Sequence, residues 1–332
     1  MTKLLSANNP SLYLLAVLLS VFFHVFAFFS TQDMSFVTQY HEPASNYIFG
    51  SLQTIDSTVA WSIMLAAGAV IQSIMAWMIN DIINQEKINS KKTYFFSILY
   101  VLVSSFSISW LVLSPQLISA FLMVLAIKRI FVLSHQEKFF SQLFDLGFIF
   151  SLAVLFFFPS VIMMLFILPA LYSVRPFSVV EFLRMAFGFF TPLFIAFGFY
   201  FLMSDISLLP SHILNSENLF FITKSFLTTA NIALSAICIG WLALSALMFS
   251  VFPFSINIKA RKMVGVMGLL VLFFGLSLFM PTHYSMAQWL FIVPTMTFLL
   301  GMIILEFHHR IIPNVIFALL IVTNVMSFVF QL

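Results

Sequence analysis

The sequence predicts an all-α fold, a polytopic bundle of transmembrane helices with about 11 spans (range about 10 to 12) and the amino terminus inside the cell. Of the 332 residues, 62% are hydrophobic and only 8% are charged. Soluble domains carry roughly a quarter charged residues, so this chain has too few charges to cover a water-exposed surface. The apolar segments lack the period-2 alternation of barrel strands, so helices are expected. Residues 1–332 are predicted to form one integral membrane domain.

Apolar segments of membrane-spanning length recur along the chain. A helix rises about 1.5 Å per residue, so about 20 residues cross a hydrocarbon layer of about 30 Å. The connectors between the segments carry the helix breakers and most of the charges. In chain order, the predicted spans are residues 11–29, 58–78, 94–113, 116–133, 143–158, 160–173, 185–203, 225–250, 263–280, 288–305 and 312–330.

Two hairpins are unusually short. The fifth and sixth segments meet at Pro159, and their roughly 14 to 16 residues reach only about 21 to 24 Å. They are expected either to thin the bilayer locally or to be partly re-entrant. The third and fourth segments turn within Ser114 and Pro115, which leaves almost nothing outside the membrane.

The positions of Lys and Arg predict the orientation. Cytoplasmic connectors retain these residues during insertion. With the amino terminus in the cytoplasm, Lys224 alone among the 14 Lys and Arg residues falls outside. This pattern predicts a cytoplasmic amino terminus and a carboxyl terminus outside. The inner set is Lys3, Lys87, Lys91, Lys92, Lys128, Arg129, Lys138, Arg175, Arg184, Lys259, Arg261, Lys262 and Arg310.

Several function classes lose support. The single cysteine, Cys238, excludes an intrachain disulfide and cysteine-based zinc binding. The basic residues are scattered over several connectors, so no nucleic-acid partner is predicted. The sequence has no Walker loop, GxGxxG, HExxH or GxSxG motif. It assigns no cofactor and no metal site, and it leaves open whether the protein is an enzyme.

Acidic and histidine side chains in the predicted external loops are the candidate catalytic residues. The first loop holds Asp33, His41 and Glu42, and later external segments add Asp205 and His283. If folding brought these loops together, a carboxylate would serve as a general base or bind a divalent ion. The alternative is that external loops are acidic because they exclude basic residues. Asp33 is the first candidate because it directly follows a span.

The segment from Arg175 to Arg184 predicts a helix start at the inner surface. Ser178 and Glu181 have the spacing of a capping box. Arg175 and Arg184 are candidate ligands for a lipid phosphate, because Arg presents two parallel donors. The alternative is that both arginines extend to the interface without binding a specific lipid.

Other polar residues inside the spans are interpreted as structural. Lys128 and Arg129 are expected to extend their charges to the cytoplasmic interface, and Asp145 is expected to pair with one of them. His24 is assigned to helix packing, because no acid lies near the middle of another span. Ser97, Tyr100, Ser104 and Ser107 fall at helical spacing, and this stripe is assigned to close helix packing.

The segment from Phe144 to Tyr200 carries a family resemblance. It contains FDLGFIFSLAVLFFFPS followed by RPFSVVEFLRMAFGFFTP. These runs, together with SANNP and LSPQLISAFLMVLAIKRI, resemble a membrane-protein family of Bacteroidota catalogued as a domain of unknown function. The resemblance covers most of the chain and implies no activity. A looser architectural likeness links the short hairpins and the acidic first loop to glycosyltransferases that use polyprenyl-phosphate sugars. This loop lacks their adjacent acidic pair, which argues against metal-assisted transfer.

Three functions are consistent with these observations. The first follows the bacterial resemblance: a multispanning protein of the cytoplasmic (inner) membrane, with a periplasmic carboxyl terminus. It would act in envelope biogenesis and handle a lipid-linked glycan or another lipid-phosphate intermediate. The second is a non-catalytic scaffold subunit whose partners are other membrane proteins of an envelope complex. The third is a transporter, for which buried charge is sparse. In every case the lipid bilayer is the expected environment.

Overall fold

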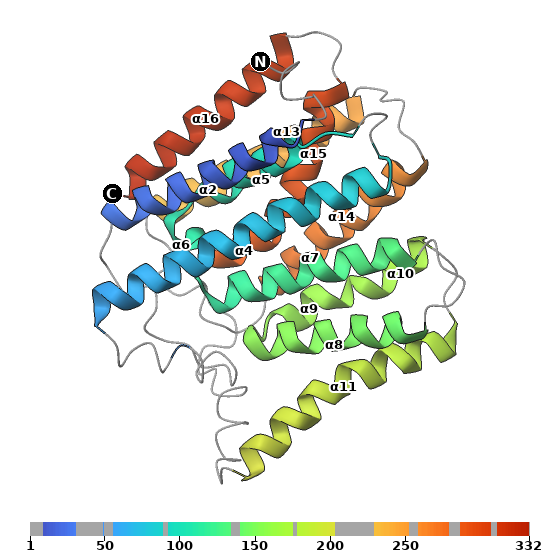
Figure 1. Ribbon diagram of the computed structural model, residues 1–332. Helices are drawn as coiled ribbons and strands as arrows, with labels where there is room; N and C mark the ends of the chain where they lie inside the picture. The colour runs from blue at the N-terminus through green and yellow to red at the C-terminus, as the bar shows by residue number, and fades with distance from the viewer. Residues whose placement is uncertain are drawn as a thin grey trace.

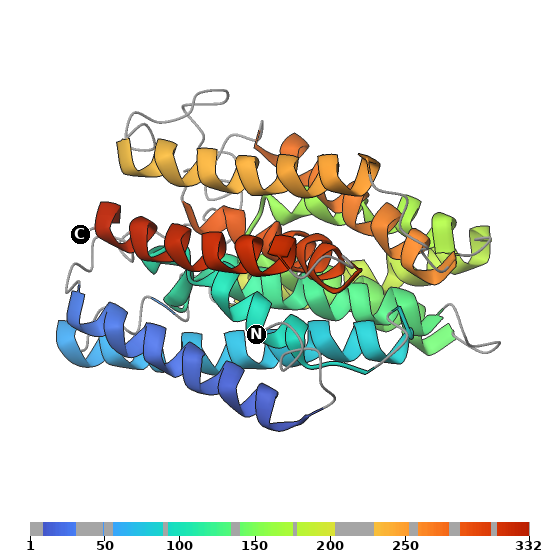
Figure 2. The same ribbon diagram turned by 90° about the horizontal axis from the view of Figure 1, so that it is seen from above.

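Helices make up nearly all of the structure. The computed structural model describes residues 9–30, 49, 56–88, 92–133, 140–174, 178–202, 229–251, 258–278, 286–306 and 311–331. This part of the chain contains no strand, so the all-α prediction is confirmed. The long helices lie side by side with roughly aligned axes (Figure 1), and they are stacked in layers when the molecule is turned (Figure 2).

The described helices follow the predicted apolar segments closely. In chain order they are α2 (Ser11–Ser30), α4 (Ser57–Gln85), α5 (Phe95–Ser104), α6 (Ile108–Leu111), α7 (Pro115–Leu133), α8 (Phe140–Phe156), α9 (Ser160–Leu165), α10 (Ile167–Val174), α11 (Val179–Leu202), α13 (Thr229–Val251), α14 (Ile258–Ser277), the 3-10 helix η3 (Met286–Phe291), α15 (Val293–Glu306) and α16 (Ile311–Gln331).

Six of the described helices are long and apolar enough to cross a bilayer: α2, α4, α7, α11, α13 and α14. Shorter apolar helices of 10 to 17 residues lie between them or follow them in the chain, among them α5 and α15. Such a set of helices is that of a membrane protein.

Three predicted spans are interrupted rather than continuous. The predicted span 94–113 consists of α5 and α6, because Ser107 has an extended backbone with φ −136° and ψ 138°. The span 160–173 is divided into α9 and α10 at Phe166. The span 288–305 begins with the 3-10 turns of η3 before α15. Each interruption lies inside an apolar run, where hydropathy alone gives no signal.

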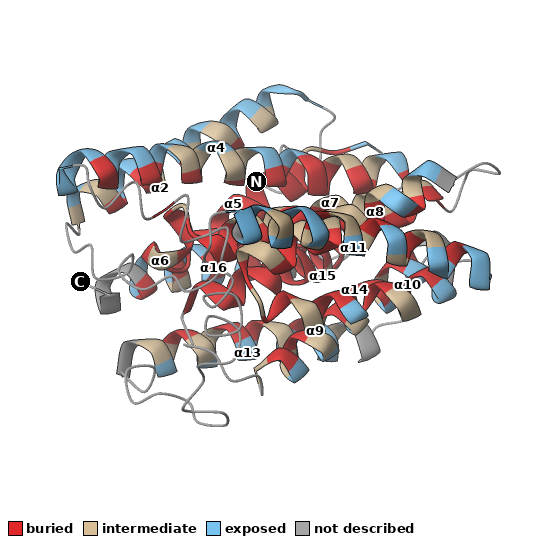
Figure 3. Cartoon of the chain, turned by 90° about the horizontal axis from the view of Figure 1, so that it is seen from below, coloured by how far each residue is buried: buried red, intermediate tan, exposed pale blue. Residues whose placement is uncertain are grey.

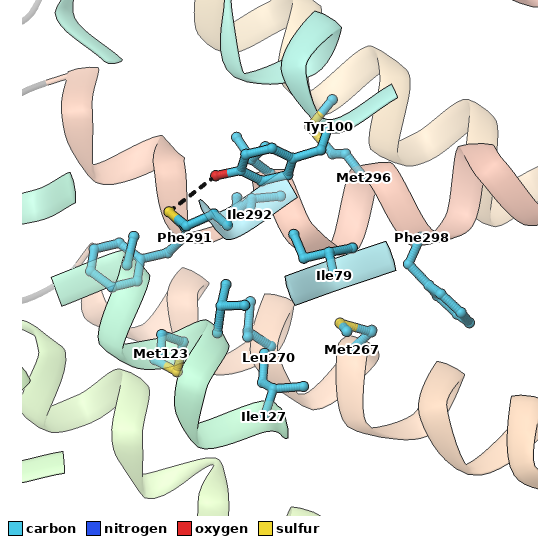
Figure 4. Packing of buried hydrophobic residues seen from close by; sticks show 14 of the residues in the cluster. Ile79, Tyr100, Met123, Ile127, Met267, Leu270, Phe291, Ile292, Met296 and Phe298 are labelled. Atoms are coloured by element: carbon cyan, nitrogen blue, oxygen red, sulfur yellow. Dashed lines mark hydrogen bonds between the residues drawn. The ribbon is translucent and has the colours of Figure 1, made fainter. Parts of the chain in front are cut away.

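Helix α5 occupies the centre of the bundle. All of its residues from Phe95 to Ser104 are buried, and it packs against α2, α4, α15 and α16. Buried residues are concentrated in the interior of the bundle, and exposed residues mark its outer faces (Figure 3). One contiguous cluster of buried apolar side chains includes residues from every described helix. Within it, the Tyr100 hydroxyl donates to the Met75 sulfur at 3.3 Å (Figure 4).

Three of the four residues of the predicted packing stripe, Ser97, Tyr100 and Ser104, lie on α5 and contact α4. The Ser97 hydroxyl donates to the Ala76 carbonyl oxygen at 3.2 Å, and the Ser104 hydroxyl donates to Gln72 Oε1 at 3.2 Å. With Tyr100 between them, these residues join one face of α5 to α4. Ser107 lies beyond the end of α5, at the interruption.

Helices α8 and α11 approach each other unusually closely. A Cβ atom on Gly147 would clash with the Met185 carbonyl oxygen, and one on Gly188 would clash with the Phe144 carbonyl oxygen. Each helix therefore contributes a glycine that faces the backbone of the other, an arrangement that allows helices in membranes to pack tightly. Helix α11 packs mainly against α8 and lies at the edge of the bundle (Figure 1).

Candidate functional site

Several buried polar side chains surround the interruption between α5 and α6, among them Gln72, Ser104 and Asn324. The amide of Ser105 still donates to the Val101 carbonyl oxygen at 3.1 Å, and regular helix then ends. Val112 is extended, and the amide of Leu113 donates to the Met64 carbonyl oxygen of α4 at 3.1 Å. Non-helical backbone at membrane depth is tolerated where protein buries it or where it lines a cavity.

Gln72 of α4 connects the two sides of the interruption. Its Nε2 donates to the Trp110 carbonyl oxygen at 2.7 Å, and its Oε1 accepts from the Ser104 hydroxyl at 3.2 Å. Its side chain is 1% exposed. A single amide therefore pairs with the end of α5 and with α6, which fixes their relative position.

Asn324 of α16 contacts the interruption from another direction. Its Nδ2 donates to the Leu102 carbonyl oxygen at 2.8 Å and to the Ser105 hydroxyl at 2.7 Å. On the η3 side, the Trp110 indole Nε1 donates to the Met286 carbonyl oxygen at 2.6 Å. Helix α6 is thus tied to both α4 and η3, and the end of α5 is tied to α16.

Three buried polar side-chain atoms have no hydrogen-bond partner among the protein atoms and belong to elements that pack against α5 or α6: Trp61 Nε1, Gln288 Nε2 and Asn324 Oδ1. Trp61 packs with Ile108 and Leu111 of α6, and Gln288 belongs to η3, which packs against α6 and α7. Unpaired buried polar atoms are uncommon in folded proteins, and an unobserved water or ligand is one explanation for them. We use "the α6 site" for Trp61, Gln72, Ser104, Ser105, Gln288 and Asn324.

His24 lies on the α2 side of α6. Its Nδ1 is 2.7 Å from the Ser20 carbonyl oxygen, and its Nε2 is 3.0 Å from the Leu111 carbonyl oxygen. Gly68 of α4 leaves room for the same Leu111 carbonyl, because a Cβ there would clash with it. His24 therefore joins α2 to the end of α6, which agrees with the packing role assigned from the sequence.

Of the predicted site residues, the structure describes only Arg184. Arg184 is half-buried near the start of α11. The predicted capping box beside it is present: the Ser178 amide donates to Glu181 Oε2 at 3.1 Å, and the Glu181 amide donates to the Ser178 hydroxyl at 3.4 Å. The other candidates lie outside the described residues, namely Asp33, His41, Glu42, Arg175, Asp205 and His283.

Asp56, an acid just before α4, has a local structural role. Its carboxylate accepts from the Thr58 amide at 3.2 Å and so caps the start of α4. Among the described residues, no group of three or more His, Cys, Asp or Glu side chains is arranged to hold a metal ion.

Lys128 pairs with an acid that the sequence analysis did not select. Its Nζ lies 2.8 Å from Asp81 Oδ2 and 4.9 Å from the centroid of the Trp77 ring. The sequence analysis proposed Asp145 as the partner of Lys128 or Arg129. Helices α4 and α8 both pack against α7, and Lys128 pairs with Asp81 of α4 and not with Asp145 of α8.

The residues of the α6 site were mostly missed by the sequence analysis. Amides inside apolar runs were the available signal, because a buried amide in a membrane span needs a partner. Gln72, Gln288 and Asn324 are such amides. Chemically, the described side chains of the α6 site are donors and acceptors without charge, so they are suited to binding rather than to acid–base chemistry.

Comparisons with known proteins found no matching family model, no matching curated protein and no matching solved structure.

Proposed function

We propose that this chain is an inner-membrane protein of bacterial envelope biogenesis that binds a lipid-linked glycan, with the head group at the α6 site. The observation that supports binding most directly is the interruption between α5 and α6. Polar side chains surround it, and the side chains of Gln288 and Asn324 retain unpaired buried atoms. A purely structural helix crossing would be more stable without such atoms.

The proposed topology has 11 crossings. The six long apolar helices and the five shorter ones supply them, with the split helices α5–α6, α9–α10 and η3–α15 each counted as one. The described basic side chains support the orientation. They occur at helix ends that lie on one side of the bundle (Figure 1), for example Lys87 after α4, Arg129 on α7 and Lys262 on α14. This side is the cytoplasmic one, and both the amino-terminal and carboxyl-terminal assignments follow from it.

The α6 site then lies toward the periplasmic half of the bundle. Helix α5 starts at the basic side and runs for 10 residues before the interruption, a rise of about 15 Å. Arg184 lies near the start of α11, at the basic side. In this proposal Arg175 and Arg184 bind a lipid phosphate in the inner leaflet, and the head group at α6 belongs to a different lipid. Asp33, His41, Glu42, Asp205 and His283 are proposed to line the periplasmic approach.

The inner half of α5 supports binding from one side over transport. Phe95, Phe96, Ile98 and Leu99 are all buried at 2% exposure or less, and they belong to the contiguous apolar cluster. A transporter needs access from both sides of the membrane. Closely packed aromatic and aliphatic side chains below the interruption favour a site that opens toward one face.

Binding of a polyprenyl-phosphate-linked glycan tests the proposal. The full chain in lipid nanodiscs is mixed with the glycolipid, and the complex is measured by native mass spectrometry. Gln72→Leu keeps the side-chain size but removes both hydrogen bonds, so we expect roughly tenfold weaker binding. Ser62→Ala, on the exposed face of α4, is the control and should bind like the wild type.

Failure of the wild-type chain to bind any polyprenyl-linked glycan would overturn the proposal. Asp33→Asn and Arg175→Ala variants separate the two ends of the molecule. Loss of binding in Asp33→Asn alone would support entry of the glycan from the periplasmic side. Loss of binding in Arg175→Ala alone would indicate that the head group binds at the cytoplasmic end.

A scaffold function is the second candidate, and the surface of α11 favours it. Five phenylalanines recur at alternating spacings of three and four residues, and each is more than half exposed: Phe187, Phe190, Phe194, Phe197 and Phe201. This heptad-like spacing is typical of helices that pack along a partner helix. Co-purification in mild detergent distinguishes the candidates, because Phe190→Ala with Phe197→Ala should release a protein partner without changing glycan binding.

A further inference from the structure

We infer that the link between α2 and α6 is proton-dependent: His24 holds two carbonyl oxygens at once only when both of its ring nitrogens carry a proton. The inference rests on the geometry of one imidazole ring. Its Nδ1 lies 2.7 Å from the Ser20 carbonyl oxygen, and its Nε2 lies 3.0 Å from the Leu111 carbonyl oxygen. This pH-sensitive contact goes beyond the proposed function and does not require a bound glycolipid.

Both partners of the His24 ring can only accept hydrogen bonds. A backbone carbonyl oxygen has no hydrogen to donate, and a neutral imidazole carries an N–H on just one of its two nitrogens. Neutral His24 can therefore donate to the Ser20 oxygen or to the Leu111 oxygen. Its other nitrogen then faces an oxygen lone pair. The imidazolium donates to both oxygens, and hydrogen bonds from a charged donor are the stronger ones.

Burial and hydrogen bonding act on the charged ring in opposite directions. The side chain of His24 is 4% exposed, and removing a charged group from water is costly. Two hydrogen bonds from a charged donor offset that cost. Opposing effects of this kind allow a histidine to change its charge within the ordinary pH range.

Among the described residues of α2 and α4, no other ionisable group lies opposite His24. On α2, Tyr13 is 11 residues from His24, about 16 Å along the helix axis. On α4, the position level with the end of α6 is Gly68, which faces the Leu111 carbonyl oxygen. Asp56 and Asp81 are 12 and 13 residues from Gly68, about 18 to 20 Å along the axis.

The other two helices that pack against α2 are α5 and α6, and they add no charge. Tyr100 is the ionisable residue of α5, and its hydroxyl donates to the Met75 sulfur at 3.3 Å. Met75 is seven residues beyond Gly68 on α4, about 10 Å along the axis. Helix α6 has no ionisable residue. The two carbonyl oxygens and burial are therefore the described influences on the charge of His24.

The proton matters for α6 because side chains hold this helix in place. Helix α6 has only four residues. Gln72 donates to the Trp110 carbonyl oxygen, and the Trp110 indole donates to the Met286 carbonyl oxygen. Among the described side chains bonded to α6, His24 is the one that titrates near neutral pH. Its protonation therefore changes the contact with α2 and leaves the other two contacts intact.

Displacing the Leu111 carbonyl oxygen tests the inference. Gly68→Ala places a methyl group where this oxygen lies, whereas Gly240→Ala on α13 meets no atom within 4 Å. The full chain in lipid nanodiscs carries Gln in place of the six other histidines. NMR of the isotopically labelled ring nitrogens then follows His24 from about pH 4 to about pH 9, a range that brackets the titration of histidine.

We expect His24 to take up a proton within this range. In Gly68→Ala it should bind the proton roughly tenfold less tightly, because one hydrogen bond from a charged donor is lost. Gly240→Ala should titrate like the parent chain. Thermal unfolding of each variant shows whether it is folded.

A change without added side-chain atoms provides the test if Gly68→Ala does not fold. The α-hydroxy acid analogue of valine at position 112 converts the bond after Leu111 into an ester, whose carbonyl oxygen is a weaker acceptor. His24 should then bind its proton about threefold less tightly.

Two results would overturn the inference. The first is identical titration of His24 in folded chains with an intact and with a displaced or weakened Leu111 acceptor. The second is a ring that takes up no proton across the whole pH range. Both results are independent of glycolipid binding, which is measured separately with Gln72→Leu.

Discussion

Lys128 shows how one charge is accommodated within an apolar helix. Its ammonium group contacts the Asp81 carboxylate and the face of Trp77, and Gln85 donates a further hydrogen bond to the same carboxylate oxygen at 2.8 Å. The side chains of Lys128 and Asp81 are 25% and 20% exposed. The pair therefore retains contact with the surroundings and also joins α7 to α4.

A double-mutant cycle measures this contact. Lys128→Met and Asp81→Asn, alone and together, are compared by equilibrium unfolding in detergent. Because both groups are partly exposed, we expect a coupling free energy of about 1 kcal/mol. Additive effects of the two substitutions would show that the pair contributes nothing. An equivalent cycle with Asp145→Asn should give no coupling.

Sequence reasoning succeeded for residues whose partners are local. Ser178 and Glu181 are three positions apart, and their capping box formed as predicted. It failed for Asn324, whose hydrogen-bonded partner Ser105 lies 219 positions away. No local pattern specifies such a pair, because it depends on how α16 packs against α5. The same reason explains why Asp81 was missed as the partner of Lys128.

Helix α11 packs on α8 through close backbone contact as well as through side chains, such as the edge-to-face rings of Phe150 and Phe189. Gly147 and Gly188 bring the two helices together, and the opposite face of α11 is exposed. Pro192 lies inside the same helix. The association of α11 with α8 therefore depends on the absence of a side chain at two positions.

Two glycines of α11 provide a matched test of this dependence. Gly188→Ala places a methyl group against the Phe144 backbone, whereas Gly198→Ala meets no atom within 4 Å. We expect Gly188→Ala to lower the free energy of unfolding by about 2 kcal/mol. Gly198→Ala should leave it unchanged or raise it by up to about 1 kcal/mol, because Ala favours helix. Equal effects in thermal or denaturant unfolding would contradict the close approach.

Hydropathy predicted where helices occur but not where they break. Helix α2 ends one residue beyond its predicted boundary, whereas α4 continues seven residues beyond Met78. The predicted span 94–113 has the length of one apolar crossing, yet its helix is interrupted between Ser104 and Ile108. Hydropathy measures side-chain transfer to lipid. The hydrogen bonds from Gln72 and Asn324 that stabilise the interruption come from other helices.

On the scale of the whole molecule, the charges define two unlike ends. The described basic side chains lie at helix ends on one side of the bundle (Figure 1). The sequence predicted this separation without the fold, because charge bias depends only on position along the chain. The convergence of the candidate catalytic residues on one site stays a prediction, because they lie outside the described residues: Asp33, His41, Glu42, Asp205 and His283.

Cysteine labelling tests the orientation directly. Lys92→Cys and Ser57→Cys place thiols at exposed positions, and Cys238→Ala removes the buried native thiol. In spheroplasts, a membrane-impermeant maleimide should modify the thiol at position 57. It should modify the thiol at position 92 only after the membrane is disrupted. Labelling of position 92 in intact spheroplasts would reverse the topology.

The reciprocal contact of Gly147 and Gly188 has a consequence for how this protein can vary. A larger residue at either position pushes the two backbones apart, and that displacement also opens space at the other position. The second substitution therefore costs less once the first is present. Over long divergence the two positions would be inherited as a linked pair, and relatives would keep both glycines or lose both.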